Sequence, residues 1–211
     1  MKFLAGLVHV AVASKVVFDN LKPNIDGVTA SFALRDRVLA TQFRSPPASD
    51  DACESEGLTV DRVIFTMDTS RVVAGSGTVL QVGICSSVNG KLLGASQWGS
   101  HGGLVGVPNC TKSDLLDTVP IDKIQSRAEL EWSPSSPIVL DPATLYWVAV
   151  SSNADDFSNA PRWWFGANTY NNDNDPKKDF VYATTDSPNG RWFPNSDDEN
   201  RIVGAMKVVG K

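Results

Sequence analysis

The segment from Pro137 to Ser151 restricts the fold more than any other part of the chain. Its run Leu-Tyr-Trp-Val-Ala-Val, residues 145–150, places β-favouring residues at both alternating sets of positions. Asp141-Pro142 is a turn signal just before this run, so the strand has a defined start. A strand that is apolar on both faces lies inside a packed β structure rather than at its edge. The segment therefore predicts a central strand of an all-β protein.

Short β-type segments recur along the rest of the chain, separated by Gly, Pro, Asn, Asp and Ser. The predicted strands are residues 30–34, 38–43, 58–67, 78–86, 128–132, 144–151, 162–167, 179–184 and 201–209. A helix is expected only over residues 113–124, where Pro120 interrupts the pattern. Many strands with little helix predict antiparallel sheets packed face to face, as in a β-sandwich or jelly roll.

The 211 residues suffice for one domain of this class, and no linker or shift in composition marks a second one. We therefore expect a single β-sandwich domain over residues 15–211.

Residues 1–14 have two interpretations. Lys2 precedes an apolar run from Phe3 to Val12, and Ala11 and Ala13 form an A-x-A cleavage pattern, as in a secretory signal peptide. The same apolar residues also suit an N-terminal β-strand that is retained in the fold. The sequence leaves both interpretations open.

The charge of the chain excludes two classes of partner. The formal net charge is −5, and no basic run is longer than the pair Lys177-Lys178. A nucleic-acid backbone and an anionic membrane surface both attract clustered positive charge. We therefore expect no nucleic-acid partner and no membrane insertion.

The three cysteines indicate in which kind of cellular compartment the protein resides. Cys85 lies in an apolar strand, where a small buried side chain is the expected role. Cys53 and Cys110 lie in polar, loop-like segments and are predicted to form a disulfide in an oxidising compartment. Asn109 begins the sequon Asn-Cys-Thr, a glycosylation signal in a secreted eukaryotic protein. A disulfide at Cys110 would compete with addition of that glycan.

Aromatic residues in polar loops are the main candidates for ligand binding. Trp163 and Trp164 are adjacent, so on a strand they point to opposite faces and one of them lies outside the core. Trp192 follows a turn, and Tyr170 opens an Asn-rich loop. Aromatic faces beside amides and carboxylates are typical of sugar sites, so these four residues form the predicted glycan site. A protein–protein interface and a loop-covered core remain alternatives.

No catalytic motif is present in the sequence. The only histidines are His9 and His101, and no nucleophile elbow accompanies the glycine-rich segment around His101. Acidic residues that a glycosidase could use lie among polar neighbours, where solvated acids are the default. These acids are Asp155, Asp156, Asp173, Asp175, Asp197, Asp198 and Glu199. We expect no enzymatic activity.

One segment offers ligands for a metal. Asp173 and Asp175 provide carboxylates on alternate residues, a spacing that Ca²⁺ uses in proteins. The alternative is an Asx-rich turn without metal. No other cofactor is expected.

The order of the segments resembles that of a β-sandwich module of bacterial and algal surface proteins called "choice-of-anchor R". The matching segments are Val17–Asn20, Leu39–Phe43, Leu58–Phe65, Val79–Ser86 and Ile138–Ser151, the last containing Thr144-Leu-Tyr-Trp147. The chain departs from the module at Cys85, where an aromatic residue is usual, and in the long segment 96–116. The resemblance implies a noncatalytic sandwich at an extracellular or particle surface, and it supplies no catalytic residues.

Two functional hypotheses follow. The first is a noncatalytic secreted or surface-displayed β-sandwich, structural or binding, with a glycan or a protein as its partner. The second is a subunit of an ordered assembly, such as a viral capsid or decoration protein or an extracellular filament. In that case the N-terminal strand is kept at a contact between copies of the chain.

Overall fold

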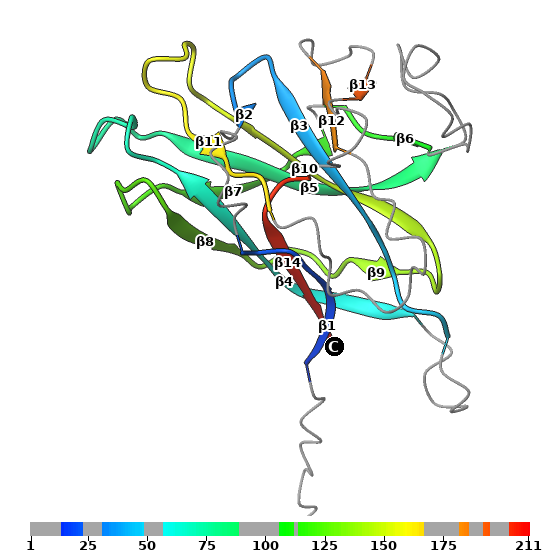
Figure 1. Cartoon of the computed structure of the whole chain (residues 1–211). Helices are drawn as coiled ribbons and strands as arrows, with labels where there is room; N and C mark the ends of the chain where they lie inside the picture. The colour runs from blue at the N-terminus through cyan, green and yellow to red at the C-terminus, as the bar shows by residue number, and fades with distance from the viewer. Residues whose placement is uncertain are drawn as a thin grey trace, which may run out of the picture.

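The computed structural model describes residues 14–22, 31–48, 57–88, 106–111, 114–166, 182–185, 192–194 and 203–211. These residues form two β-sheets that face each other, and all of the strand pairs are antiparallel (Figure 1). No α-helix occurs in these ranges. The prediction of an all-β sandwich is confirmed.

Sheet 1 is built around its longest strand, β4. Its strands are β1 (Lys15–Asp19), β2 (Ser31–Phe32), β4 (Leu58–Asp68), β8 (Ala128–Trp132), β9 (Val139–Leu140), β11 (Arg162–Trp163) and β14 (Met206–Gly210). The strand order is β1-β14-β4-β11-β2. Both β14 and β11 pair with one edge of β4, and β8 and β9 pair with its other edge. The C-terminus therefore ends beside β1, as Figure 1 shows.

Sheet 2 has β10 at its centre, as the sequence predicts. Its strands are β3 (Val38–Arg44), β5 (Val79–Val88), β6 (Val107–Pro108), β7 (Asp117–Pro120), β10 (Leu145–Ser152), β12 (Tyr182–Thr185) and β13 (Phe193–Pro194). The order is β13-β12-β3-β10-β5, with β6 and β7 on the far side of β5. Trp147 of β10 lies opposite Gln42 of β3 and Cys85 of β5.

Both faces of β10 are buried, which explains its apolar alternation. Tyr146, Val148 and Val150 point into the core between the two sheets. Trp147 and Ala149 point the other way, into a second cluster on the outer face of sheet 2. All five side chains are no more than 8% exposed. Sheet 2 is therefore covered on both sides within the part of the chain that the structure describes.

A disulfide holds the outer cover of sheet 2. Cys85 of β5 and Cys110 are bonded, with their Cα atoms 5.5 Å apart, and Leu115 and Trp192 join them in the outer cluster. Gly83 lets this cover approach closely, because a Cβ at that position would lie 2.9 Å from the carbonyl oxygen of Asp114.

The predicted pairing of Cys53 with Cys110 is wrong. Side chains alternate along β5, so Leu80 and Val82 face the core while Cys85 faces outward, where the covering segment brings Cys110. The burial predicted for Cys85 is correct, at 5% exposure, but its role is to form a cross-link. Cys53 lies outside the described residues.

All nine predicted strand segments coincide with or overlap a strand of the structure. The helix predicted over residues 113–124 is wrong, because β7 occupies part of that segment. Val119 points into the core between exposed neighbours, which is a strand pattern, and Pro120 ends the strand. Asp117 ties β7 to β8, since its carboxylate accepts hydrogen bonds from Trp132 Nε1 at 2.9 Å and Ser135 N at 3.0 Å.

The described ranges contain no helix of the length and apolar character that a membrane span requires.

Candidate binding site at one end of the sandwich

Two of the four aromatic residues predicted to bind glycans are core residues. Trp163 is fully buried, and Trp192 is 8% exposed within the outer cluster of sheet 2. Neither offers a ring face to a ligand, so the prediction is wrong for both. Tyr170 lies outside the described residues.

Trp163 and Trp164 point to opposite faces of sheet 1, as expected of neighbours on a strand. Trp163 lies between the sheets, where its Nε1 donates to the carbonyl of Ala205 at 3.0 Å. Trp164 is half-buried on the outside, and its Nε1 donates to the carbonyl of Ser126 at 2.6 Å. The guanidinium of Arg127 lies over its ring at 5.4 Å from the centroid. The β7–β8 connection therefore partly covers Trp164.

Three loops instead meet at one end of the sandwich and form what we call the rim: residues 33–37, 69–78 and 153–161. They connect β2 to β3, β4 to β5 and β10 to β11, and the blue and yellow loops project together at the upper left of Figure 1. Ser152 Oγ donates to the carbonyl of Ala33 at 2.6 Å, and Arg35 N donates to the carbonyl of Ala154 at 2.8 Å. These bonds hold the first and third loops side by side.

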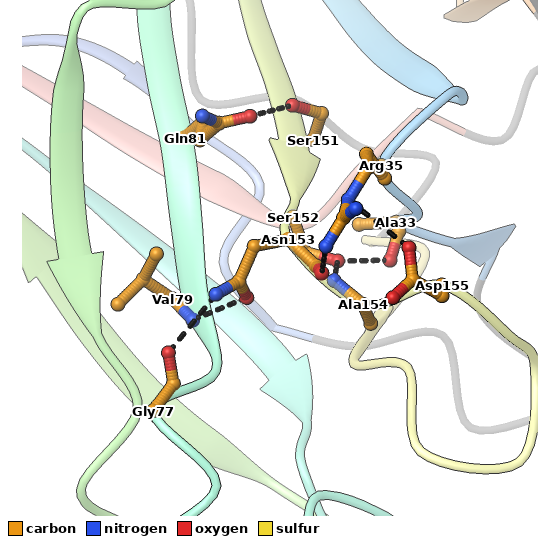
Figure 2. A network of polar contacts seen from close by, with 10 residues as sticks. All are labelled: Ala33, Arg35, Gly77, Val79, Gln81, Ser151, Ser152, Asn153, Ala154 and Asp155. Carbon is orange, nitrogen blue, oxygen red and sulfur yellow. Dashed lines mark hydrogen bonds and ion pairs between the residues drawn. The ribbon is translucent and has the colours of Figure 1, made fainter.

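Asn153 joins all three loops of the rim. Its Oδ1 accepts a hydrogen bond from Val79 N at 2.9 Å, and its Nδ2 donates to the carbonyl of Gly77 at 3.0 Å. Its own carbonyl accepts from Arg35 Nη2 at 3.2 Å. Figure 2 shows Asn153 between the β4–β5 turn on one side and Arg35 on the other. A loop that is bonded in this way on two sides is ordered before any ligand arrives.

The rim contains a pocket of about 320 Å³. It is lined by Leu34, Arg35, Asp36, Arg37, Asp155 and Phe157. Two of these residues form an ion pair, with Arg35 Nε 3.0 Å from an Asp155 carboxylate oxygen, and both side chains are more than half exposed (Figure 2). The pocket therefore combines charged groups with an aromatic ring.

Phe157 is the aromatic residue among those that line this pocket. It is 52% exposed and meets Phe32 edge to face, with ring centroids 5.0 Å apart and an interplanar angle of 88°. In a perpendicular pair, at least one face of each ring is left uncovered by the other ring. Phe32 in turn lies under the guanidinium groups of Arg71 and Arg162, at 5.7 and 5.6 Å from its centroid.

The carboxylate of Asp68 anchors the base of this aromatic cluster. Asp68 is 2% exposed, forms an ion pair with Arg162, and accepts hydrogen bonds from Ser70 N at 2.9 Å and Ser70 Oγ at 2.6 Å. Burial, the largest single influence, raises its pKa. The hydrogen bonds from Ser70 and the Arg162 charge together outweigh burial and lower the pKa below its usual range.

We expect Asp68→Asn to change the acid limb of the stability curve. The pKa of Asp68 in the folded state lies below its value of about 4 in the unfolded chain, so its ionised carboxylate stabilises the fold above about pH 4. This stabilisation is lost as the pH falls through the folded-state pKa. The variant should be less stable than the wild type at neutral pH, and the difference should shrink below about pH 4. Urea unfolding at a series of pH values measures this difference, and two parallel curves would contradict the assignment.

Two other predicted sites have different outcomes. Asp173 and Asp175, the calcium candidates, lie outside the described residues, and the described ranges contain no group of three or more metal-ligating side chains. Asn109 is exposed, and its Nδ2 lies 3.4 Å from Ser86 Oγ. The cysteine of its sequon is engaged in the disulfide, so a glycan there would have to coexist with that bond.

The residues of the rim pocket are absent from the predicted glycan site, although one of them, Asp155, is among the acids considered above, as is its neighbour Asp156. Asp155 pairs with Arg35, and Asp156 accepts from Ser158 N at 2.7 Å. The available signal was Phe157, a single large apolar residue in a polar loop that directly follows the central strand. No protein-family model matches the chain, and no curated protein matches it.

Proposed function

We propose that the chain is a noncatalytic β-sandwich that works outside the reducing cytoplasm and binds its partner through the rim. The Cys85–Cys110 disulfide is the observation that carries this proposal. Disulfides persist in secreted and surface proteins and are rare where thiols are kept reduced. This bond fastens the cover over the outer face of sheet 2, so its role is structural and continuous rather than transient.

The rim supports the binding part of the proposal. Loops carried on a rigid scaffold are the usual place for recognition. Here Asn153 joins the three loops of the rim, and two of them, residues 33–37 and 153–161, line a pocket. The resemblance to the surface module implies the same kind of role. Arg35 and Asp155 line the pocket and are both more than half exposed, so both groups can reach a partner.

Surface labelling of the native source tests the location. Lys15, Lys123 and Lys211 are exposed, so an amine-reactive biotin that cannot cross membranes should label the protein on intact cells or particles, or in the medium. Peptide mapping would identify the labelled lysines, and a cytoplasmic protein of the same cells is the control. Labelling that requires lysis would contradict the proposal.

A second candidate function is that of an assembly subunit, and the edge of sheet 1 favours it. Within the described residues sheet 1 ends at β1, where Val16 is 44% exposed. An edge strand can accept a strand from a second copy. Light scattering at micromolar concentration decides this case: an assembly subunit gives particles much heavier than the chain of 22.7 kDa, and a monomer mass excludes it.

A further inference from the structure

We infer that the rim pocket is a binding site for a neutral carbohydrate. This inference rests on the proposed binding function and names its ligand class and residues. The pocket has a volume of about 320 Å³, which falls in the range of small-molecule sites. Its lining includes neither of the two predicted tryptophans that are buried, so it replaces the aromatic site that the sequence indicated.

The first element of the site is an aromatic platform. Sugars present a face of C–H groups that stacks on an aromatic ring, and this contact requires an open ring face held at a defined angle. Phe157 meets this requirement, because it is 52% exposed and its ring is held perpendicular to Phe32. Phe32 is itself held between neighbouring side chains, including Arg162 on the paired strand.

The second element is a pair of opposite charges beside the platform. A sugar hydroxyl both donates and accepts hydrogen bonds, so a carboxylate next to a guanidinium matches it. Asp155 and Arg35 are 3.0 Å apart, and Arg35 also donates to the carbonyl of Asn153, which orients its guanidinium (Figure 2). Hydrogen bonds to charged groups are among the stronger ones.

The charge balance of the pocket selects a neutral ligand. Two arginines, Arg35 and Arg37, and two aspartates, Asp36 and Asp155, line it. Their formal charges cancel, so the pocket has no excess positive charge to attract an anionic glycan. Because the interaction does not depend on net charge, its affinity should change little with salt.

The third element is the order of the loops. The side chain of Asn153 is bonded to Gly77 of the β4–β5 turn and to Val79 at the start of β5, and Arg35 N donates to the carbonyl of Ala154. A ligand that enters an ordered site loses less free energy to loop ordering than one that enters a flexible site. The framework in Figure 2 therefore favours binding in addition to the contacts themselves.

Affinity electrophoresis tests the inference. Native gels would contain a soluble neutral polysaccharide, such as a β-glucan, a mannan or a xyloglucan, or the anionic polysaccharide alginate. We expect at least one neutral polysaccharide to retard the wild type, equally at low and high salt. Phe157→Ala should lower the affinity about tenfold, the upper end of what an aromatic contact contributes. Phe157→Trp should keep the retardation.

Phe193→Ala is the matched control. Phe193 of β13 is 45% exposed and is not among the residues that line the pocket, so its removal should leave the retardation unchanged. Circular dichroism of each variant shows whether the sandwich is folded. Asp155→Asn, which removes the ion pair with Arg35, should weaken binding while the fold is kept.

Each of the following outcomes of the electrophoresis would overturn one part of the inference. Equal retardation of the wild type and Phe157→Ala would show that glycans bind elsewhere, which leaves the binding function standing. Retardation by alginate alone, or by no neutral polysaccharide, would overturn the ligand class. The proposed location outside the cytoplasm is tested separately. Biotin labelling that occurs only after lysis would contradict that location without bearing on the ligand.

Discussion

Replacing Trp163 by alanine should lower the free energy of unfolding by about 3–5 kcal/mol, the range for truncating a buried Trp. Its ring is fully buried between the sheets and meets Phe65 and Tyr182 edge to face, at 5.6 and 6.4 Å between centroids. It packs so closely that a Cβ on Gly204 would lie 2.5 Å from its Cε2. Alanine leaves a cavity and also orphans the buried carbonyl of Ala205 that accepts from Nε1. Urea unfolding followed by tryptophan fluorescence gives the value.

Trp164→Ala is the control for this prediction. It removes the same side chain from the next residue, but there the indole is half-buried and lies outside the core. We expect a loss of less than about 1.5 kcal/mol, since one hydrogen bond and a partly exposed ring are removed. Equal losses for the two variants would contradict the burial of Trp163. The contrast also means that a loss of ligand binding by Trp163→Ala would report unfolding rather than a lost contact.

Removing the Cys85–Cys110 disulfide should lower the free energy of unfolding by about 3.5 kcal/mol. The two cysteines are 25 residues apart in sequence, and the chain-entropy relation for a loop of that length gives about this value. The loss acts mainly through the unfolded chain, which gains freedom when the cross-link is absent. Cys85→Ala/Cys110→Ala, compared with the wild type in urea without reductant, measures it.

Reductant provides the control for the disulfide. It should bring the unfolding midpoint of the wild type close to that of the double variant and should leave the double variant unchanged. A wild-type midpoint that does not respond, under conditions in which mass spectrometry shows full reduction, would contradict a stabilising role. Leu115→Ala should also weaken the cover, because Leu115 packs in the same outer cluster.

The sequence was sufficient for the fold class and for the approximate positions of most strands, because the strand signals are local. The alternation at Tyr146, Trp147 and Val148 predicts a strand buried on both faces, and the structure places the two sets in two different clusters. The bounds of β4 and β8 also agree closely with the segments predicted from β-favouring residues. These patterns depend on neighbours in the chain, so no tertiary information is needed to find them.

The candidate site could not be predicted in the same way, because it is formed by contacts between residues that are distant in sequence. Sheet packing, rather than local composition, determines which face of β5 carries Cys85 and brings residue 110 over that face. The exposure of Trp163 relative to Trp164 depends on which face of sheet 1 meets sheet 2. Phe157 forms a pocket only together with Arg35, which lies far from it in sequence and lines the same pocket. Such pairings form across loops, where periodicity carries no signal.

A nonreducing peptide map of the protein isolated from its native source, with free thiols blocked at lysis, tests the central claim most directly. A disulfide-clamped sandwich that works outside the reducing cytoplasm predicts a peptide pair joined through Cys85 and Cys110, with no blocked thiol at either position. Blocked thiols at both cysteines in native material would contradict it, because the protein would then reside where thiols stay reduced.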